Sequence, residues 1–387
     1  MDFSWTEDQQ TLYAETVRFA DKKIAWHSHE DGFQRERFRS NFIKCGEHGI
    51  LSCIVPIEYG GLGLSALSVA RVMEALGFGC RDMGLVFSIS AQIFATILPV
   101  LRFGSEHLRD TLLKQVAGGK IVAAHAATEV EAGSDVFSMR TQAVREGDEY
   151  LINGSKCFVT NAPEADLFVV FARTKPGTDL FGISAFLVDR DTPGVQVSKA
   201  YDKNGLRGSP TGDVFFDNCR IPAIRRLGGE GQGARIFIHS MNWERVGIMC
   251  TYVGSMERQL NETIKYARTR KQFGRAIKDY QGVSHKIADM KVRLETARLV
   301  GYRAAWSLEN EATSGISIES AVAKLVISEA AVQSSLDAMQ VHGGLGVMTE
   351  AGVERHLRDA LPSRVFSGTS EILRNTIANG LGLNVSS

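Results

Sequence analysis

The spacing of the apolar residues changes twice along this chain, and no other feature of the sequence constrains its fold as strongly. From about 4 to 118, and again from about 232 to 380, apolar residues recur at helical spacing. Between about 120 and 225 they form strand-length runs, such as 167–172 and 183–188, separated by turn residues. No helical segment lies between these runs, as a parallel sheet would require. The sequence therefore predicts an α+β fold, with an antiparallel barrel or sandwich between two helical blocks.

The same periodicity places individual helices. Thr6 and Gln9 have the form of a capping box at the start of the first helix. Apolar helical segments at 66–79 and 84–103 complete the first block. The last block is expected to hold three long amphipathic helices, which favour a bundle; they span about 233–268, 280–311 and 318–341.

These patterns divide the chain into an N-terminal helical domain (1–119), a middle β-domain (120–230) and a C-terminal helical domain (231–387). Clefts form where such domains meet, and ligands commonly bind there. We therefore expect the functional site at a domain junction.

Composition excludes several classes of protein. The chain carries 44 Lys and Arg against 44 Asp and Glu, so it lacks the basic excess of a nucleic-acid binder. No stretch reaches the roughly 18 uninterrupted apolar residues of a membrane span, and the polar, acidic N-terminus is no secretory signal. Six cysteines without CxxC spacing and nine scattered histidines predict buried, reduced thiols and no metal site. We expect a cytoplasmic protein.

Two glycine-containing segments are candidates for phosphate binding. The segment 228–233 has glycine spacing close to a dinucleotide fingerprint, but it joins the β-block to a helical block outside any βαβ unit, which favours an interdomain turn. The segment 128–135 follows a predicted strand, and its Gly133 and Ser134 suit an anion site. An ordinary polar turn is the alternative for this second segment.

Five motifs, in the same order, resemble those of the acyl-CoA dehydrogenases. They begin with the TEPxAGSD signature and end with the R-D…E-G-T-x-x-I segment of that family, so the resemblance covers nearly the whole chain. In this sequence the matching segments are 127–135, 153–162, 267–274, 340–346 and 358–372. The resemblance implies the family's architecture, with a C-terminal four-helix bundle, and a bound FAD cofactor.

The resemblance also assigns residues to FAD. It places the backbone of Ala127 and Thr128 at the pyrimidine edge of the flavin, Ser134 at the pyrophosphate, and Phe158 and Thr160 beside the flavin ring. It implies that a second group reaches the flavin of a neighbouring subunit, which suggests a homotetramer; this group comprises Arg270, Gln272, Phe273, Gln340, Val341 and Gly344. Thr369 and Glu371 are expected near the adenosine.

The usual catalytic base of the family is missing. Most members carry a glutamate where this chain has Ser367, and a serine hydroxyl is too weak a base to remove an α-proton unaided. Glu244 is the candidate replacement, because it shares a predicted helix face with Met241, Gly247 and Ile248. A surface glutamate paired with a nearby cation is the alternative from the residues alone. A minority of the family carries its base at this position, so the resemblance favours Glu244.

Three residues are expected to contact the substrate. Ser367 still supplies a backbone N–H, which in this fold hydrogen-bonds the thioester carbonyl. Gly247 would leave room for the substrate beside Glu244, and Arg245 neighbours the base.

A narrower resemblance concerns the substrate. Segments 82–88, 243–244, 334–340 and 362–370 resemble those of family members that oxidise proline attached to a peptidyl carrier protein. It implies α-proton removal by Glu244 and hydride transfer to the flavin, ending in a pyrrole-2-carboxyl thioester for antibiotic and other pyrrole biosynthesis. Basic residues at 35–39 and 225–226 are candidate docking patches for an acidic carrier protein; solvated surface charges are the alternative.

Other functions stay open at this point. The chain could oxidise a short or branched acyl group on CoA or an acyl carrier protein, or be a flavin-fold scaffold without dehydrogenase activity. The electron acceptor is expected to be an electron-transfer flavoprotein or oxygen, and the sequence does not distinguish between them.

Overall fold

The structure is a computed structural model that describes residues 4–24, 32–177, 180–309 and 316–383. The N-terminal block is helical. Thr6 caps the first helix with the expected capping box, since its hydroxyl accepts from the Gln9 N–H and the Gln9 side chain accepts from the Thr6 N–H. The helices are α1 (Glu7–Lys22), α2 (Arg35–Glu47), α3 (Ala66–Gly79), α4 (Met83–Gln92), α5 (Leu98–Phe103) and α6 (Glu106–Ala117).

A buried helical rod runs through this block. Helices α4 and α5 are joined without a break by a π-helical turn, Ile93–Ile97. The rod Met83–Phe103 is long and apolar enough to cross a membrane, but 83% of its most apolar window is buried inside the protein. It is the core helix of the block, and its π-turn is of the kind that often occurs near functional sites.

The middle block forms one sheet in the order β6-β7-β3-β2-β4-β5-β8, with β1 paired to β4. Antiparallel pairs dominate, but β1 runs parallel to β4, and β2 meets β4 in parallel at one position. The sheet is therefore mixed and not wholly antiparallel as predicted. The connection from β1 to β4 passes through the hairpin of β2 and β3, so the parallel pairing needs no helix. The strands are β1 (Ala123–Ala126), β2 (Gln142–Glu146), β3 (Glu149–Thr160), β4 (Leu167–Arg173), β5 (Ile183–Asp189), β6 (Val195–Val197), β7 (Thr211–Pro222) and β8 (Arg226–Leu227).

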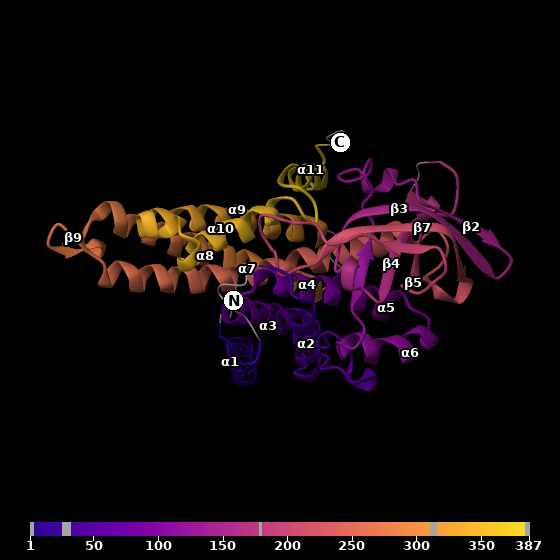
Figure 1. Ribbon diagram of the computed structural model, residues 1–387, viewed down its shortest axis with the longest axis horizontal. Coiled ribbons are helices and arrows are strands. Elements are labelled where there is room, and N and C mark those ends of the chain that lie inside the picture. Colours follow the sequence, from indigo (N-terminus) through magenta and orange to yellow (C-terminus); the bar gives the residue numbers. More distant parts are fainter. Residues whose placement is uncertain (1–3, 25–31, 178–179, 310–315, 384–387) are drawn as a thin grey trace.

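The C-terminal block holds three long helices that lie side by side and extend away from the sheet (Figure 1). The first of them is about 55 Å long at 1.5 Å per residue. At the end remote from the sheet, the strands β9 and β10 form a hairpin that connects two of the helices. The elements are α7 (Gly233–Thr269), β9 (Lys271–Gln272), β10 (Arg275–Ala276), α8 (Gln281–Glu309), α9 (Ile316–His342), α10 (Val353–Ala360) and α11 (Ser370–Gly380).

The glycine segment 228–233 connects β8 to α7 between the second and third blocks, as expected for an interdomain turn. Its backbone is stabilised locally, because the Gln232 side chain accepts from the Gly229 N–H at 3.0 Å. The last glycine, Gly233, packs on the backbone of Ile183, where a Cβ would lie 2.8 Å from its carbonyl carbon.

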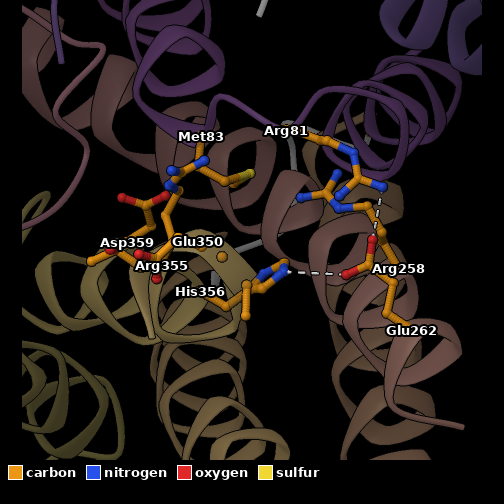
Figure 2. A pocket seen from close by; sticks show the side chains of 11 residues that line it. Arg81, Met83, Arg258, Glu262, Glu350, Arg355, His356 and Asp359 are labelled. Atoms are coloured by element: carbon orange, nitrogen blue, oxygen red, sulfur yellow. Dashed lines mark ion pairs between the residues drawn. The ribbon is translucent and has the colours of Figure 1, made fainter. Parts of the chain in front are cut away.

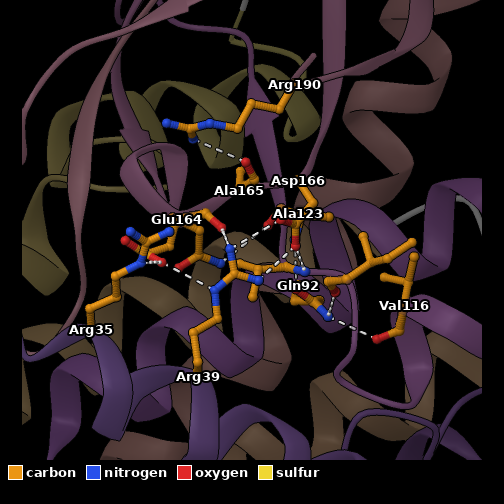
Figure 3. A network of polar contacts seen from close by, with 12 residues as sticks. Arg35, Arg39, Gln92, Val116, Ala123, Glu164, Ala165, Asp166 and Arg190 are labelled. Atoms are coloured by element: carbon orange, nitrogen blue, oxygen red, sulfur yellow. Dashed lines mark hydrogen bonds and ion pairs between the residues drawn. The ribbon is translucent and has the colours of Figure 1, made fainter.

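A polar network joins the N-terminal helices to the sheet (Figure 3). Glu164 accepts from Arg35 and Arg39, each at 3.1 Å, and Arg39 also pairs with Asp166 at 2.7 Å. The buried Gln92 side chain donates to the carbonyl of Val116 at 2.8 Å and accepts from a backbone N–H of β1. These bonds fix helices α2 and α4 on the sheet.

The arginines of the two candidate carrier docking patches take part in contacts within the chain. Arg35 and Arg39 are engaged in the network, and the side chain of Arg37 donates to the carbonyl of Gly32 at 3.0 Å. At the second patch, Arg225 pairs with an aspartate of β5, and Arg226 donates to a tyrosine hydroxyl of β3. Both patches serve intramolecular contacts. All six cysteines are buried and unpaired, which confirms the prediction of free, buried thiols.

Candidate active site

Glu244 lies on α7, which contacts both α4 and the π-turn that follows it. Its side chain is 7% exposed, so the interpretation as a solvated surface glutamate is wrong. The neighbouring Asn242 anchors this part of the helix, because its amide bonds to Ser317 at 3.1 Å and Ser320 at 3.0 Å on α9. The carboxylate is therefore held by helix packing in a site that excludes most water.

The electrostatics of this site bring the pKa of Glu244 close to neutral pH. Burial raises the pKa of Glu244 to about 7, while the Ser367 hydroxyl and the Arg245 guanidinium pull it down less strongly. The hydroxyl of Ser367 donates directly to Oε1 of Glu244. A carboxylate with this pKa can accept and release a proton near neutral pH, which is the requirement for a general base.

Ser367 occupies a strained turn between α10 and α11. Its φ is +53°, in the left-handed region that non-glycine residues rarely adopt, and Gly368 follows at +98°. Arg245 donates from Nε to the carbonyl oxygen of Ser367 at 2.9 Å. Lys324 donates from Nζ to the carbonyl oxygen of Gly368 at 2.7 Å. Two cations from two helices thus hold two successive carbonyls of the turn.

Gly247 does not leave space for a substrate, and that prediction is wrong. A Cβ at Gly247 would lie 2.1 Å from Cε2 and 2.2 Å from Cζ of Phe94. The ring of Phe94 comes from the π-turn between α4 and α5, and it fills the space one helical turn from Glu244. Gly247 is required there because the ring packs directly on the backbone of α7.

Aromatic side chains border the turn. The ring of Phe366, which directly precedes Ser367, lies 4.7 Å from the ring of Phe87 on α4 and 6.4 Å from that of Tyr252 on α7. Two of these rings lie next to neighbours of Glu244, since Phe366 precedes Ser367 and Phe94 packs on Gly247. Burial of Glu244 favours the neutral form of its carboxyl group, which is the direction of its pKa shift.

One group of predicted cofactor residues assembles at the sheet. The carbonyl of Thr128 accepts from the N–H of Cys157 at 2.9 Å, so Ala127 and Thr128 at the end of β1 lie beside β3. Phe158 and Thr160 are two residues apart on β3, and Phe158 lies where the pairing of β3 with β7 shifts register, between Lys156 and Val159. Phe158 is 67% exposed with a φ of +54°, and Tyr201 is its ring neighbour at 5.6 Å.

The loop with Ser134 is ordered by a buried ion pair below it. Glu129 accepts from Lys156, which is fully buried, at 2.8 Å and from the Thr141 N–H at 2.9 Å. Lys156 also donates to the carbonyl of Ala127 at 3.0 Å. Ser134 itself is exposed near the tip of this loop. The loop is therefore built around Glu129 and is more than an ordinary polar turn.

A second group of predicted cofactor residues lies at the far end of the bundle (Figure 1). Arg270, Gln272 and Phe273 belong to the hairpin of β9 and β10, and Phe273 is 93% exposed. Gln340, Val341 and Gly344 lie where α9 ends, close to the same hairpin; Gln340 and Gly344 are exposed, whereas Val341 is buried.

Arg270 follows Glu244 by 26 residues along α7, which corresponds to roughly 40 Å. The structure therefore does not bring this second group to the sheet within one chain. Thr369 and Glu371 lie elsewhere again, at the start of α11, where the Thr369 hydroxyl caps the helix by accepting from the Ile372 N–H.

The residues at the sheet fit a flavin. A planar ring system needs an apolar surface to lie against and backbone groups at its edge. The side chain of Phe158 offers the apolar surface, and the backbone of Ala127 and Thr128 at the end of β1 offers the polar groups. Phe158 is an exposed, large apolar side chain held outward by its backbone, as expected of a surface that a ligand covers. Within the described ranges, no three His, Cys, Asp or Glu side chains lie close enough to hold a metal ion.

A cavity of about 200 Å³ lies away from Glu244, between the start of α4, α7 and α10 (Figure 2). Its charged groups neutralise one another: Glu262 pairs with Arg81 at 2.9 Å and with His356 at 3.7 Å. Arg258 binds three carbonyls at the end of α3. Since Arg258 follows Glu244 by 14 residues, this cavity is roughly 20 Å from the base.

Several residues of the site were not predicted from the sequence. Lys324 and Phe94 act through contacts with residues 44 and 153 positions away. Lys324 is a cation on the buried stripe of an amphipathic helix, which is a signal that the sequence does contain. Phe94 lies within an uninterrupted apolar run, so its sequence context does not distinguish it from other core residues.

Comparisons with known proteins agree with this architecture. Family models for the N-terminal, middle and C-terminal domains of acyl-CoA dehydrogenases match residues 6–120, 124–219 and 231–382. An L-prolyl-[peptidyl-carrier protein] dehydrogenase of Pseudomonas fluorescens is 43% identical over 384 residues, which covers 99% of this chain and 100% of that protein.

Two solved structures are also similar. One is described as PigA with FAD and proline, with a TM-score of 0.95 and 40% identity over 100% of both chains. The other is the prolyl acyl carrier protein oxidase AnaB, with a TM-score of 0.94 and 41% identity over 98% of this chain and 100% of that one. With its three domains matched in order and relatives of this identity along its whole length, the chain belongs to the acyl-CoA dehydrogenase family.

Proposed function

We propose that this protein is an FAD-dependent dehydrogenase that oxidises L-proline held as a thioester on a peptidyl carrier protein. The observation that carries the proposal is the buried Glu244, bonded to Ser367 in the position where most of the family has its base. The similarity to an L-prolyl-[peptidyl-carrier protein] dehydrogenase and to PigA with FAD and proline supports the substrate. The expected product is the pyrrole-2-carboxyl thioester, which requires two successive two-electron oxidations and a loss of four hydrogens in total, with the flavin reoxidised by the electron acceptor after each.

The chain's own residues supply the proton chemistry. When bound, FAD supplies the acceptor for the hydride that leaves the β-carbon. Glu244 accepts the α-proton of the thioester, and its pKa of about 7 leaves a large fraction ionised at neutral pH. The backbone N–H of Ser367 stabilises the negative charge that develops on the thioester oxygen. The fixed turn keeps this donor in place before the substrate arrives.

Aromatic rings lie next to the residues that neighbour Glu244. The ring of Phe94 packs on the backbone of α7 at Gly247, and the ring of Phe366, which precedes Ser367, lies 4.7 Å from that of Phe87. A buried acid with a raised pKa is typical of an active site, and a flavin-fold scaffold without activity would have no need of one.

We further propose that FAD is shared between subunits of a homotetramer. Ala127, Thr128 and Phe158 lie at the sheet, whereas Arg270 and Phe273 lie at the far hairpin of the same chain. One flavin cannot meet both groups within a single chain, but it can if the hairpin reaches a neighbouring subunit. The 93% exposure of Phe273 fits a side chain that is covered only in the assembly.

The decisive experiment is mass spectrometry of the carrier protein after incubation. Prolyl-loaded carrier is incubated with the FAD-bound protein, and a loss of four hydrogens from the loaded arm is expected. Isovaleryl-CoA serves as the comparison substrate. Oxidation of the CoA ester with an unchanged prolyl carrier would replace the proposal with a short- or branched-chain acyl-CoA dehydrogenase. The absence of flavin reduction by either substrate would leave a scaffold protein.

The same reaction identifies the electron acceptor. AnaB is described as an oxidase, which favours oxygen as the acceptor for this chain as well. Reoxidation of the reduced flavin by air, compared with reoxidation by an electron-transfer flavoprotein, separates the two. We expect the reaction to take place in the cytoplasm.

A further inference from the structure

We propose that Lys324 is a positioning residue that holds the Ser367–Gly368 turn so that the Ser367 hydroxyl stays bonded to Glu244. The inference rests on the proposed role of Glu244 as the base. It concerns a buried cation that takes no direct part in the proton transfer described above.

The side chain of Lys324 is committed to the turn. Lys324 is fully buried on α9, and its Nζ donates to the carbonyl oxygen of Gly368 at 2.7 Å. Its Nζ also lies 5.8 Å from the centre of the Phe366 ring, within reach of a cation–π contact. A buried ammonium is costly to keep, so one placed against a backbone carbonyl indicates that this carbonyl needs a strong donor.

The turn needs such a donor because its conformation is unfavourable. Ser367 and Gly368 have φ values of +53° and +98° in succession. A side chain in the left-handed region is strained, and only surrounding contacts keep it there. Arg245 holds the carbonyl of Ser367 from α7, and Lys324 holds the carbonyl of Gly368 from α9. Removing either cation frees one peptide group and lets the Ser367 side chain rotate away from Glu244.

Charged groups surround both partners. Around Lys324 these are Arg245 of α7, Glu329 of α9, Arg364 before α11 and Glu371 of α11. Burial and the charge of Arg245 lower the pKa of Lys324 to about 7, so its hold on the turn is strongest below that pH.

Glu244 is faced by Ser367 and Arg245, both of which lower its pKa. If Lys324 acts through the turn, its loss weakens the Ser367 bond and raises the pKa of Glu244.

The test is an infrared titration of the Glu244 carboxyl group in the FAD-bound protein. The carboxylic acid C=O band is assigned as the band lost in Glu244→Gln. In Ser367→Ala the midpoint of this band is expected to rise by about one pH unit, the equivalent of one hydrogen bond. In Lys324→Met it is expected to rise by roughly half a unit. In the double variant, which combines Ser367→Ala with Lys324→Met, the hydroxyl that Lys324 positions is absent. Lys324→Met is therefore expected to add no further shift of the midpoint.

Matched variants make the outcome specific. Lys324→Arg keeps a cation and is expected to keep the wild-type midpoint. Lys203→Met removes a half-buried lysine that also donates to a backbone carbonyl, that of Ser209, and is expected to leave the midpoint unchanged. If Lys324→Met does not fold, Lys324→Gln takes its place. An unchanged midpoint in the Lys324 variant, an equal shift in Lys203→Met, or an additive shift in the double variant overturns the proposal.

This titration needs no turnover, so its failure is distinct from failure of the proposed function. A protein that does not oxidise prolyl carrier but shows the coupled midpoints retains the Lys324 inference and loses the substrate. A protein that oxidises prolyl carrier with an uncoupled midpoint retains the function and loses the inference.

Discussion

The two ends of the long helical bundle differ in how completely one chain builds them. At the end near the sheet, Glu244 is buried and bonded to Ser367, and the turn is held by Arg245 and Lys324. At the far end, the hairpin presents Phe273 almost fully to solvent. The difference teaches that one chain builds the proposed acid–base site by itself, whereas the proposed sharing of FAD would require residues from two chains.

The largest expected effect is at the near end. Glu244→Gln removes the proton acceptor while keeping the shape of the side chain, and the rate of flavin reduction is expected to fall by roughly 10² to 10⁴. FAD absorbance and oligomeric state stay unchanged, because the far end is untouched. Stopped-flow spectroscopy with prolyl carrier measures the rate. Near-normal reduction in this variant would remove Glu244 from the mechanism.

The far end is tested by Phe273→Asp. A charged side chain on the hairpin is expected to weaken FAD binding by about tenfold or more and to shift the protein toward smaller assemblies. Ile57→Asp, at a site of 79% exposure on the N-terminal block, is the matched control. Cofactor titration and size-exclusion chromatography measure both properties. Unchanged binding and assembly would mean that one chain holds FAD alone, and the comparison of the two ends would fail.

The pH dependence of flavin reduction should follow the ionisation of Glu244, at the end of the bundle near the sheet. Glu244 must be ionised to accept a proton, and burial raises its pKa to about 7. The rate is therefore expected to be constant above this pKa and to fall about tenfold per pH unit well below it. A profile that falls only below about pH 5, where an ordinary glutamate titrates, would place the rate-limiting proton transfer elsewhere.

Packing at the near end is tested by Gly247→Ala. The new methyl group meets the ring of Phe94, and overpacking of this kind costs about 1–3 kcal/mol of unfolding free energy. Thermal or denaturant unfolding measures the loss. In the double variant with Phe94→Ala the contact is gone, so Gly247→Ala should cost much less there. Additive losses would show that another neighbour limits this position.

The smallest effect is expected for Ser367→Ala above the pKa of Glu244. The backbone N–H and the Arg245 bond to the Ser367 carbonyl survive, so flavin reduction should slow only a few-fold at high pH. Rates measured at pH 9 make this comparison. A loss as large as that of Glu244→Gln would make the hydroxyl itself essential.

Much of this architecture could be predicted from the sequence because it depends on local patterns. The change of apolar spacing placed the three blocks, and the capping box at Thr6 fixed the first helix. The spacing around Glu244 left a buried and a surface position open, and the family resemblance favoured the buried one that the structure shows. The parallel pairing of β1 with β4 was missed because the rule that parallel strands need a helical crossover does not hold when a hairpin lies between them.

Features that depend on distant contacts could not be predicted. Nothing next to Gly247 in the sequence shows that the ring of Phe94 will pack against it. Nothing beside Lys324 shows that it will donate a hydrogen bond to a carbonyl 44 residues later. The ion pairs of Arg35 and Arg39 with Glu164 could not be predicted for the same reason. A cluster of arginines looks the same in the sequence whether it pairs within the chain or lies on a docking surface.

The outward hairpin of β9 and β10 has a consequence for how such a protein behaves at low concentration. If half of the cofactor contacts come from a neighbour, the apparent affinity for FAD is set by mass action among subunits as well as by the site itself. Dilution would then release flavin from a chain whose own fold is intact, and excess flavin would in turn favour reassembly.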